Sequence, residues 1–265
     1  MRFFNHRRLS QVEFFLFFKA LTIRNVLFWL LFPWILPQAL WLRKTAPRTA
    51  AADGPSHGST GVGERCLLAL GDSIIAGVGV ISTAQALPAQ TAQALAQLAG
   101  EGIHWQAIGK SGADSTALLH TVRTGLPAKP LDYILISVGV NDVTGLVTLA
   151  RFRRQLHVLL QQLTAHSPNA VLAVAGIPPL RGFPLLPQPL RTLFGWRGDA
   201  FDAAIQQVTG HYPRAVHAVM DFDPHPGLFS EDGYHPSIAS YALFGKAMAK
   251  ALSEKQRALQ LSDTT

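Results

Sequence analysis

From residue 64 onward, short apolar runs alternate with longer stretches that repeat apolar side chains at helical spacing. In residues 150–166, for example, Phe152, Leu156, Leu159 and Leu163 fall on one face of a helix. The short runs, which are rich in branched residues, are CLLAL, HWQAI, YILISV, AVLAVA and AVHAVM. Such alternation is typical of βαβ units and predicts an α/β domain with a five-stranded parallel sheet covered by helices.

The first 45 residues follow a different pattern, and we predict that they form a membrane-associated segment. Residues 26–42 carry no charge, and their length of about 17 residues is at the lower edge of what spans a bilayer. Pro33 and Pro37 weaken helix continuity, so a segment lying in the membrane plane is an alternative. Residues 11–25 mix aromatic with charged side chains and predict an interfacial helix.

A cleaved signal peptide also has basic residues before an apolar run, but no small-x-small cleavage pattern follows Leu42. We therefore favour a retained membrane anchor over a cleaved signal peptide. We also favour it over a third interpretation, in which the N-terminal segment is a hairpin buried against the domain. Basic residues flank the apolar run on both sides, and their balance favours a cytoplasmic N-terminus. This predicts a bacterial inner-membrane protein with its main domain on the periplasmic side.

The remaining boundaries follow from composition. Residues 46–63 are rich in Ala, Gly, Ser, Thr and Pro, which predicts a flexible tether. We place the main domain at residues 64–256 and a short tail at 257–265. A chain of 265 residues holds one domain of ordinary size with a modest appendage.

The overall charge limits the classes of partner that the chain could bind. The net charge is +7 with 48% hydrophobic residues, and this basic balance would admit nucleic acid. No zinc-finger spacing, RNA-binding signature or continuous basic run is present, so a membrane surface is favoured and no nucleic-acid partner is predicted. Cys66 is the only cysteine, which rules out an internal disulfide. The oligomeric state is left open.

Chemistry is expected in the loops after the strands, because ligands of open parallel sheets bind beyond the carboxyl ends. The first strand leads to GDSIIAG, in which Ser73 would begin a helix with its N–H free. The second leads to KSGADS with Gly112, and the third to VGVNDV with Asn141. The two backbone amides and the Asn141 side chain predict an oxyanion hole.

The last informative loop is DGYHPS, before the C-terminal helix. Asp232 and His235 are three residues apart, close enough for the carboxylate to hold one imidazole nitrogen. The other nitrogen would then take the proton of Ser73, as in a Ser–His–Asp triad. Asp72 and Asp142 are interpreted as hydrogen-bond partners that order their loops.

In this order the blocks resemble the SGNH (GDSL-type) hydrolase family: GDSIIAG with Ser73, SGADS with Gly112, GVNDV with Asn141, and DGYH with Asp232 and His235. The chain departs from the GDSL string only in having Ile74 after the serine. The resemblance covers residues 64 to about 254 and is strongest to small bacterial, membrane-anchored members. It implies a three-layer α/β/α flavodoxin-like fold, esterase or lipase-type activity, and no metal or other cofactor.

Other residues compete for roles in the site. His211, His217 and His225 are rival bases, the last with Asp221 and Asp223 nearby, but we prefer His235. The proline-rich loop 176–199 carries Phe183, Leu186 and Leu190, which either line an acyl pocket or dock the loop on the domain. Its arginines, Arg181, Arg191 and Arg197, either meet lipid phosphate or face water.

These residues predict ester hydrolysis in two steps on a lipid or an acylated glycan, with Ser73 as nucleophile and His235 as base. A deacetylase or acetyl transferase on a cell-envelope glycan would use the same residues with a smaller acyl pocket. A membrane-tethered binding module that has lost turnover is the alternative of another class. Acyl length and alcohol moiety are not determined by the sequence.

Overall fold

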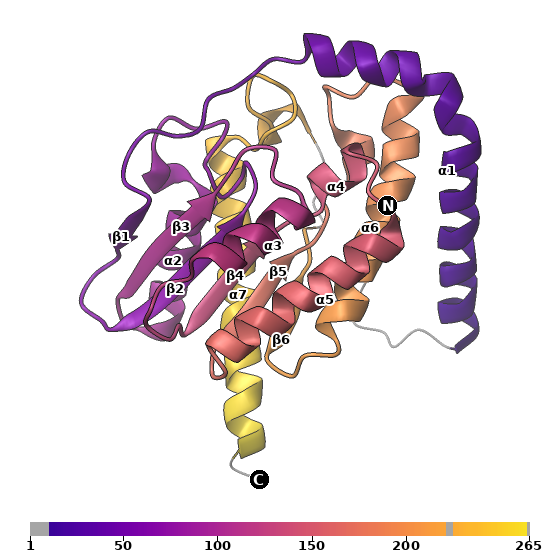
Figure 1. Cartoon of the computed structure of the whole chain (residues 1–265). Coiled ribbons are helices and arrows are strands. Elements are labelled where there is room, and N and C mark those ends of the chain that lie inside the picture. The colour runs from indigo at the N-terminus through magenta and orange to yellow at the C-terminus, as the bar shows by residue number, and fades with distance from the viewer. Residues whose placement is uncertain (1–10, 221–224, 264–265) are drawn as a thin grey trace.

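The computed structural model describes residues 11–220 and 225–263 (Figure 1). Its centre is a six-stranded sheet in the order β1-β3-β2-β4-β5-β6. The strands are β1 His57–Ser59, β2 Arg65–Gly71, β3 Ile103–Gly109, β4 Tyr133–Ser137, β5 Val171–Ala175 and β6 Ala215–Ala218. The five predicted strands pair in parallel, which confirms the predicted α/β fold. Strand β1 is an additional antiparallel edge that its three residues, HGS, do not signal.

Alternating side chains of the strands build two cores, one on each face of the sheet. In β2 and β4, Leu68 and Ile134 pair in register and face one core, whereas Leu67 and Tyr133 pair and face the other. All four side chains are almost completely buried. The continuous apolar runs therefore arise because both faces of each central strand are covered.

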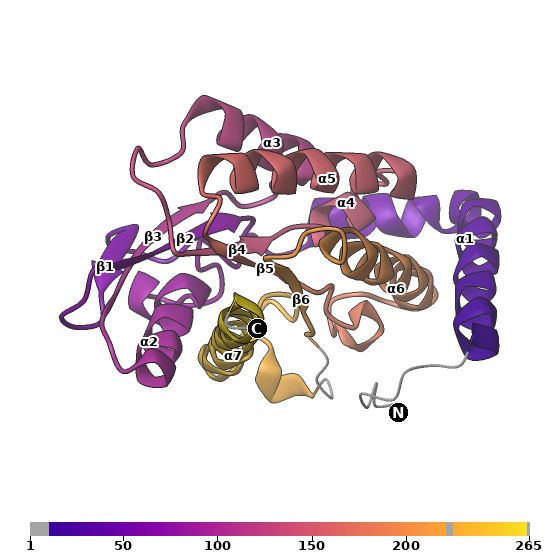
Figure 2. The same cartoon turned by 90° about the horizontal axis from the view of Figure 1, so that it is seen from below.

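The helices cover the sheet from both sides. They are α2 Leu87–Ala99, α3 Ser115–Thr124, α4 Val140–Thr144, α5 Leu149–His166, α6 Leu190–Thr209 and α7 Ile238–Asp263, with short 3-10 turns η1 Thr83–Gln85, η2 Leu180–Gly182 and η3 Pro226–Leu228. Figure 2 shows α3 and α5 on one side of the sheet and α2 and α7 on the other. Helix α7 reaches Asp263, so the predicted tail from residue 257 is helical as far as residue 263.

Residues Gln11–Thr45 form a single helix, α1, that packs along the outside of α6 (Figure 1). The two pieces expected on either side of residue 25 are thus one element. The ring of Phe28 stacks on Phe194 with 6.2 Å between centroids, and Gln38 donates from Nε2 to the Gln188 carbonyl at 2.9 Å. The described part of α1 is therefore docked on the domain through one of its faces.

Arg197 of α6 joins α1 to the rest of the domain. It is completely buried, and its guanidinium donates to the carbonyls of Val143 at 3.3 Å and Val147 at 2.7 Å. The same group lies 4.7 Å from the ring centre of Phe28, a favourable cation–π geometry. Burial lowers its pKa to about 10. The expectation that Arg197 meets lipid phosphate or water is therefore wrong, because α1 covers it.

The predicted flexible tether, residues 46–63, instead lies against the domain. It contains β1, and Asp53 forms a parallel bridge with Ser82. Its small residues permit close approach to the domain, since a Cβ on Gly77 would lie only 2.7 Å from that of Ala52. The composition that predicts flexibility in isolation therefore allows tight packing here.

Candidate active site

Ser73 lies beyond the carboxyl end of β2, where the chain order of the sheet reverses. The connection from β2 leads to β3 on one side, and β4 lies on the other. Ligands of doubly wound sheets bind at such a switch point. Gly71 lets the two neighbouring strand ends approach, because a Cβ there would lie 2.2 Å from the carbonyl oxygen of Ser137.

Ser73 does not begin a helix, and this part of the prediction is wrong. It sits in consecutive turns, in which Ala76 N–H donates to the Asp72 carbonyl at 3.1 Å and Val78 N–H to the Ser73 carbonyl at 2.9 Å. Gly77 and Gly79 have φ values of 73° and 99°, which interrupt a right-handed helix. The next α-helix begins only at Leu87.

The structure brings Ser73, His235 and Asp232 into one hydrogen-bonded line. His235 Nε2 lies 3.1 Å from Ser73 Oγ, and His235 Nδ1 lies 2.6 Å from Asp232 Oδ2. With Nδ1–H donating to the carboxylate, Nε2 is left to accept the serine proton. This is the geometry in which a histidine can deprotonate a serine hydroxyl.

Asp232 is strongly held as an anion. Burial alone would raise its pKa, but hydrogen bonds from the His235 ring, the N–H groups of His235 and Tyr234, and the Thr49 hydroxyl outweigh it and hold the pKa well below its usual range. The carboxylate therefore stays ionised at neutral and mildly acidic pH, and it fixes the tautomer of His235.

Gly79 is a site residue that the sequence pattern does not reveal. A Cβ at this position would lie 2.8 Å from the Pro236 carbonyl oxygen and 3.2 Å from His235 Cβ. Its positive φ disfavours other residues as well. Glycine here lets the loop that carries Ser73 pass directly against the loop that carries His235.

Gly112 and Asn141 lie on adjoining loops. Gly112 adopts φ 78° in a turn that Ala113 N–H closes onto the Lys110 carbonyl. Asn141 Nδ2 donates one hydrogen to the Ala113 carbonyl at 2.9 Å, which leaves its second hydrogen for another acceptor. Within the described residues, the backbone N–H groups of Ser73 and Gly112 have no hydrogen-bond partner.

Asp142 connects these two loops from beneath. It accepts a hydrogen bond from Ser115 N–H at 3.0 Å and another from the Ser115 hydroxyl, and it is completely buried. Burial raises its pKa to about 6. Its contacts match the interpretation of Asp142 as a residue that orders the loops.

Asp72 has a similar place beside the nucleophile. Its Oδ1 accepts from the Ser137 hydroxyl at 2.9 Å and from Ile74 N–H at 3.3 Å. Burial raises its pKa to about 6. The carboxyl group therefore joins the ends of β2 and β4 at the cost of burying an acidic group.

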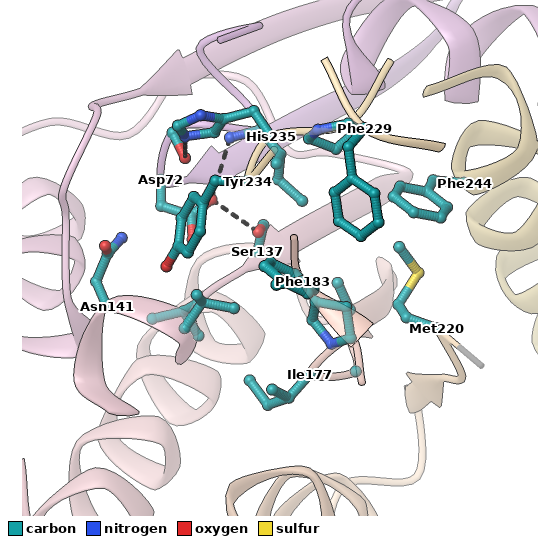
Figure 3. Close-up of a pocket in the computed structure, with 18 of the residues that line it drawn as sticks. Asp72, Ser137, Asn141, Ile177, Phe183, Met220, Phe229, Tyr234, His235 and Phe244 are labelled. Atoms are coloured by element: carbon teal, nitrogen blue, oxygen red, sulfur yellow. Dashed lines mark hydrogen bonds between the residues drawn. The ribbon is translucent and has the colours of Figure 1, made fainter. Parts of the chain in front are cut away.

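A largely apolar cavity of about 60 Å³ adjoins Ser73 and His235. In Figure 3, Met220, Phe229 and Phe244 gather on the side of the cavity away from Asn141. Ile177, Phe183 and Leu228 are also part of its apolar lining. A carbonyl group beside Ser73 could thus direct its oxygen toward Asn141 and its apolar chain into the cavity.

Of the three predicted pocket residues, only Phe183 lines this cavity. Leu186 and Leu190 do not line this cavity and are almost completely buried in the core between the sheet and α6, which favours the docking alternative for these two. Met220 and Phe244, which come from segments far along the chain, are lining residues that the sequence did not identify.

Two of the three rival histidines are engaged elsewhere, and the third, His225, is exposed. His217 Nε2 lies 2.7 Å from Asp202 Oδ1, and the ring of His211 stacks on that of His157. Asp221 and Asp223 lie outside the described residues. In the part of the chain that the structure describes, no group of three or more His, Cys, Asp or Glu residues is placed to hold a metal ion.

Comparison with known protein sequences identifies relatives from one family. Residues 69–243 match the model of the GDSL-like Lipase/Acylhydrolase family. A GDSL-like esterase of Mycobacterium tuberculosis is 31% identical over 200 residues, covering 71% of this chain but only 63% of that protein, so the match spans less than two thirds of the relative's length.

Solved structures agree at the level of the fold. A family 3 carbohydrate esterase of Clostridium thermocellum superimposes with a TM-score of 0.58 and 20% identity, over 74% of this chain and 98% of that one. A lipase/acylhydrolase from Enterococcus faecalis gives 0.57 and 19%, over 72% and 97%.

We predict that Asp72→Asn stabilises the protein at neutral and alkaline pH. Since the native pKa of about 6 lies above the ordinary 3.8, the folded state binds this proton more tightly than the unfolded chain. The free energy of unfolding therefore falls as pH rises between these values. The amide keeps an acceptor for Ser137 without a charge, so urea unfolding at pH 8 should show a gain of up to about 3 kcal/mol.

The gain should be below about 1 kcal/mol at pH 4 and should disappear near pH 2.5, below both pKa values, where Asp72 is largely protonated in both states. Asp53→Asn, at an exposed carboxylate, is the control and should change stability little at any of these pH values. Equal stability of wild type and Asp72→Asn at pH 8 would contradict this account.

Proposed function

Because the chain belongs to the GDSL-like lipase/acylhydrolase family, we propose that it cleaves carboxylic esters through an acyl-enzyme on Ser73. The observation that carries this proposal is the line from Ser73 Oγ to His235 Nε2 at 3.1 Å and from His235 Nδ1 to Asp232 Oδ2 at 2.6 Å. The adjoining apolar cavity supplies a place for an acyl chain.

In the first step, His235 takes the proton of Ser73 while Oγ attacks the ester carbonyl carbon. The developing oxyanion accepts hydrogen bonds from the N–H groups of Ser73 and Gly112 and from Asn141 Nδ2. His235 then gives its proton to the departing alcohol. Ser73 is left esterified by the acyl group.

In the second step, His235 deprotonates a water molecule that attacks the acyl carbonyl, and collapse of the second oxyanion returns the proton to Ser73 Oγ. Protonation of His235 removes the base in both steps, so activity falls on the acid side. The pKa of Asp232 is held far below its usual range, so this carboxylate does not titrate in the acid limb, whereas the neighbouring Asp72, whose pKa is raised to about 6, does.

Ser73→Ala should lower kcat for p-nitrophenyl butanoate at least about 10³-fold, because no other group can form the acyl-enzyme. His235→Ala should cause a loss of similar size. Ser56→Ala, at an exposed serine outside the site, should leave kcat within about twofold. Full activity in Ser73→Ala would exclude this mechanism, and a wild type inactive on every ester would favour the binding-module alternative.

The cavity limits the acyl group. A water molecule needs about 10–15 Å³ of such volume, so a cavity of about 60 Å³ holds roughly four to six heavy atoms. We therefore propose short-chain acyl esters as the preferred substrates, with longer chains extending beyond the cavity.

On p-nitrophenyl esters of two to sixteen carbons, kcat/KM should peak near butanoyl to hexanoyl and fall for longer chains. Met220→Trp, which fills the cavity, should move the peak to acetyl while leaving acetyl hydrolysis within about threefold. A wild-type peak at acetyl would instead favour the deacetylase alternative. A peak at palmitoyl would show that this cavity does not receive the acyl chain.

We also propose that α1 is retained and holds the enzyme at a membrane. Within the described residues, one helix, Ile23–Thr45, is long and apolar enough to cross a bilayer, a property that anchors and signal sequences share. Its outer face is apolar as well, which a helix facing water would not need. The large exposed side chains there include Ile23, Val26, Leu30, Trp34 and Trp41.

The docking contacts favour an orientation along the membrane surface. Arg24 pairs with Asp199 of α6 at 3.5 Å, and Gln38 hydrogen-bonds near the start of the same helix. A helix crossing the hydrocarbon layer would carry α6 and Asp199 with it, at a high desolvation cost. A docked α1 therefore presents its outer face to the interface, with Arg43 and Lys44 placed for anionic headgroups.

Replacing Trp34 and Trp41, which are 84% and 61% exposed, with serine should weaken co-sedimentation with phosphatidylglycerol vesicles by about tenfold or more. Val62→Ser, at a residue 98% exposed outside α1, should leave binding unchanged. Intact mass should show that the membrane-bound chain retains residues 11–45. Undiminished vesicle binding by the double variant, or a bound chain without α1, would contradict the proposal.

A further inference from the structure

The segment that follows α1 is fixed against the loop that carries Ser73. Ala52 N–H donates to the Ala76 carbonyl at 3.2 Å, and Asp53 N–H to the Ile81 carbonyl at 2.9 Å. In return, Thr83 N–H donates to the Asp53 carbonyl at 3.0 Å. These backbone bonds set the register of the segment, so the residues just before Ala52 pass over the site at a defined position.

Thr49 meets the carboxylate of Asp232 there. Its hydroxyl donates to Asp232 Oδ2 at 2.8 Å, the same oxygen that accepts from His235 Nδ1. Thr49 is exposed, whereas the Asp232 side chain beneath it is only 3% exposed. The hydroxyl thus reaches the carboxylate from the solvent side.

The remaining donors to Asp232 are local. Ser230 Oγ and the N–H groups of Tyr234 and His235 all reach Oδ1, at 2.8 to 2.9 Å. Among the described residues, Thr49 is therefore the one donor to this carboxylate from outside the loop 230–235. The local bonds hold Oδ1, and only Thr49 shares Oδ2 with the histidine.

We propose that Thr49 is a positioning residue of the triad, supplied by the segment that joins α1 to the domain. Its hydroxyl restrains rotation of the Asp232 carboxylate, so that Oδ2 stays in line with His235 Nδ1–H. It also occupies a place from which water would otherwise solvate this oxygen. The inference rests on the proposed catalytic function of Ser73, His235 and Asp232.

The catalytic unit then begins near Thr49 instead of at the predicted boundary of residue 64. Thr49 lies four residues beyond Thr45, the last residue of α1. The helix that we propose to bind lipid and the hydroxyl that supports the triad are therefore held in one short stretch of chain. An enzyme truncated at residue 64 would lose this donor together with the anchor.

The test measures the kcat and KM of full-length variants in detergent, with p-nitrophenyl butanoate as substrate. Thr49→Val keeps the shape and removes the donor, and it should lower kcat about three- to tenfold with KM within about twofold. Thr49→Ser keeps a hydroxyl and should restore kcat to within about twofold. Thr45→Val is the matched control, because the Thr45 hydroxyl bonds only to the Trp41 carbonyl of its own helix.

The pH profile separates positioning from a purely structural role. Removing the donor leaves more negative charge on Oδ2, which stabilises the protonated form of His235. The acid limb of kcat/KM should therefore move to higher pH by about a few tenths of a unit in Thr49→Val. Asp72, beside the nucleophile, also acts on His235, and the ring of Tyr234 lies edge-on to the imidazole with 5.2 Å between centroids. None of these groups changes in the variants.

Ser73→Ala in the same series distinguishes the two proposals. If it is inactive while Thr49→Val has wild-type kcat and an unmoved acid limb, only the role of Thr49 is overturned. The role of Thr49 alone is also overturned if Thr49→Val loses activity and thermal stability together, with no shift of the acid limb and no rescue in Thr49→Ser. If Ser73→Ala is fully active, the proposed function fails, and the triad that Thr49 would position fails with it.

Discussion

The reversal of strand order at β2 determines where the chemistry of this molecule can lie. Because the chain passes from β2 to β3 and later returns to β4 on the other side, the loops after these strands diverge and leave a crevice. Gly71 permits the strand ends to approach this closely, and the Ser137 hydroxyl and Asp72 tie them together. Ser73 emerges from this junction, and the loop with His235 closes over it across Gly79.

The arrangement has a thermodynamic cost that its surroundings must offset. Asp72 and Asp142 are both buried with pKa values raised to about 6, and Arg197 is buried with its pKa lowered to about 10. Each shift means that the folded protein disfavours the charged form of the group. The groups nevertheless order the loops around Ser73 and the packing of α1. Well-packed apolar cores on both faces of the sheet offset the free-energy cost of burying these charged groups.

Sequence reasoning predicted the features whose information is local. The apolar runs predicted the five parallel strands, and turn glycines at their ends predicted loops that the structure brings together around Ser73. Asp232 and His235 were predictable as a pair because three residues separate them. Thr49 was not, since its partner lies 183 residues away and its segment has the composition of a linker. The residues of the apolar loop 176–199 could not be sorted by sequence into pocket-lining and core residues either, because both roles require apolar side chains.

The assignment of Ser73 as nucleophile can be tested most directly by locating a covalent adduct on the chain. The full chain would be treated with a fluorophosphonate, digested and analysed by mass spectrometry, before and after mild acidification to protonate His235. If Ser73 is the nucleophile, a single adduct should form on the peptide that contains Ser73, and it should form more slowly at acidic pH. An adduct on a different serine, or no adduct from an enzyme that hydrolyses p-nitrophenyl esters, would contradict it.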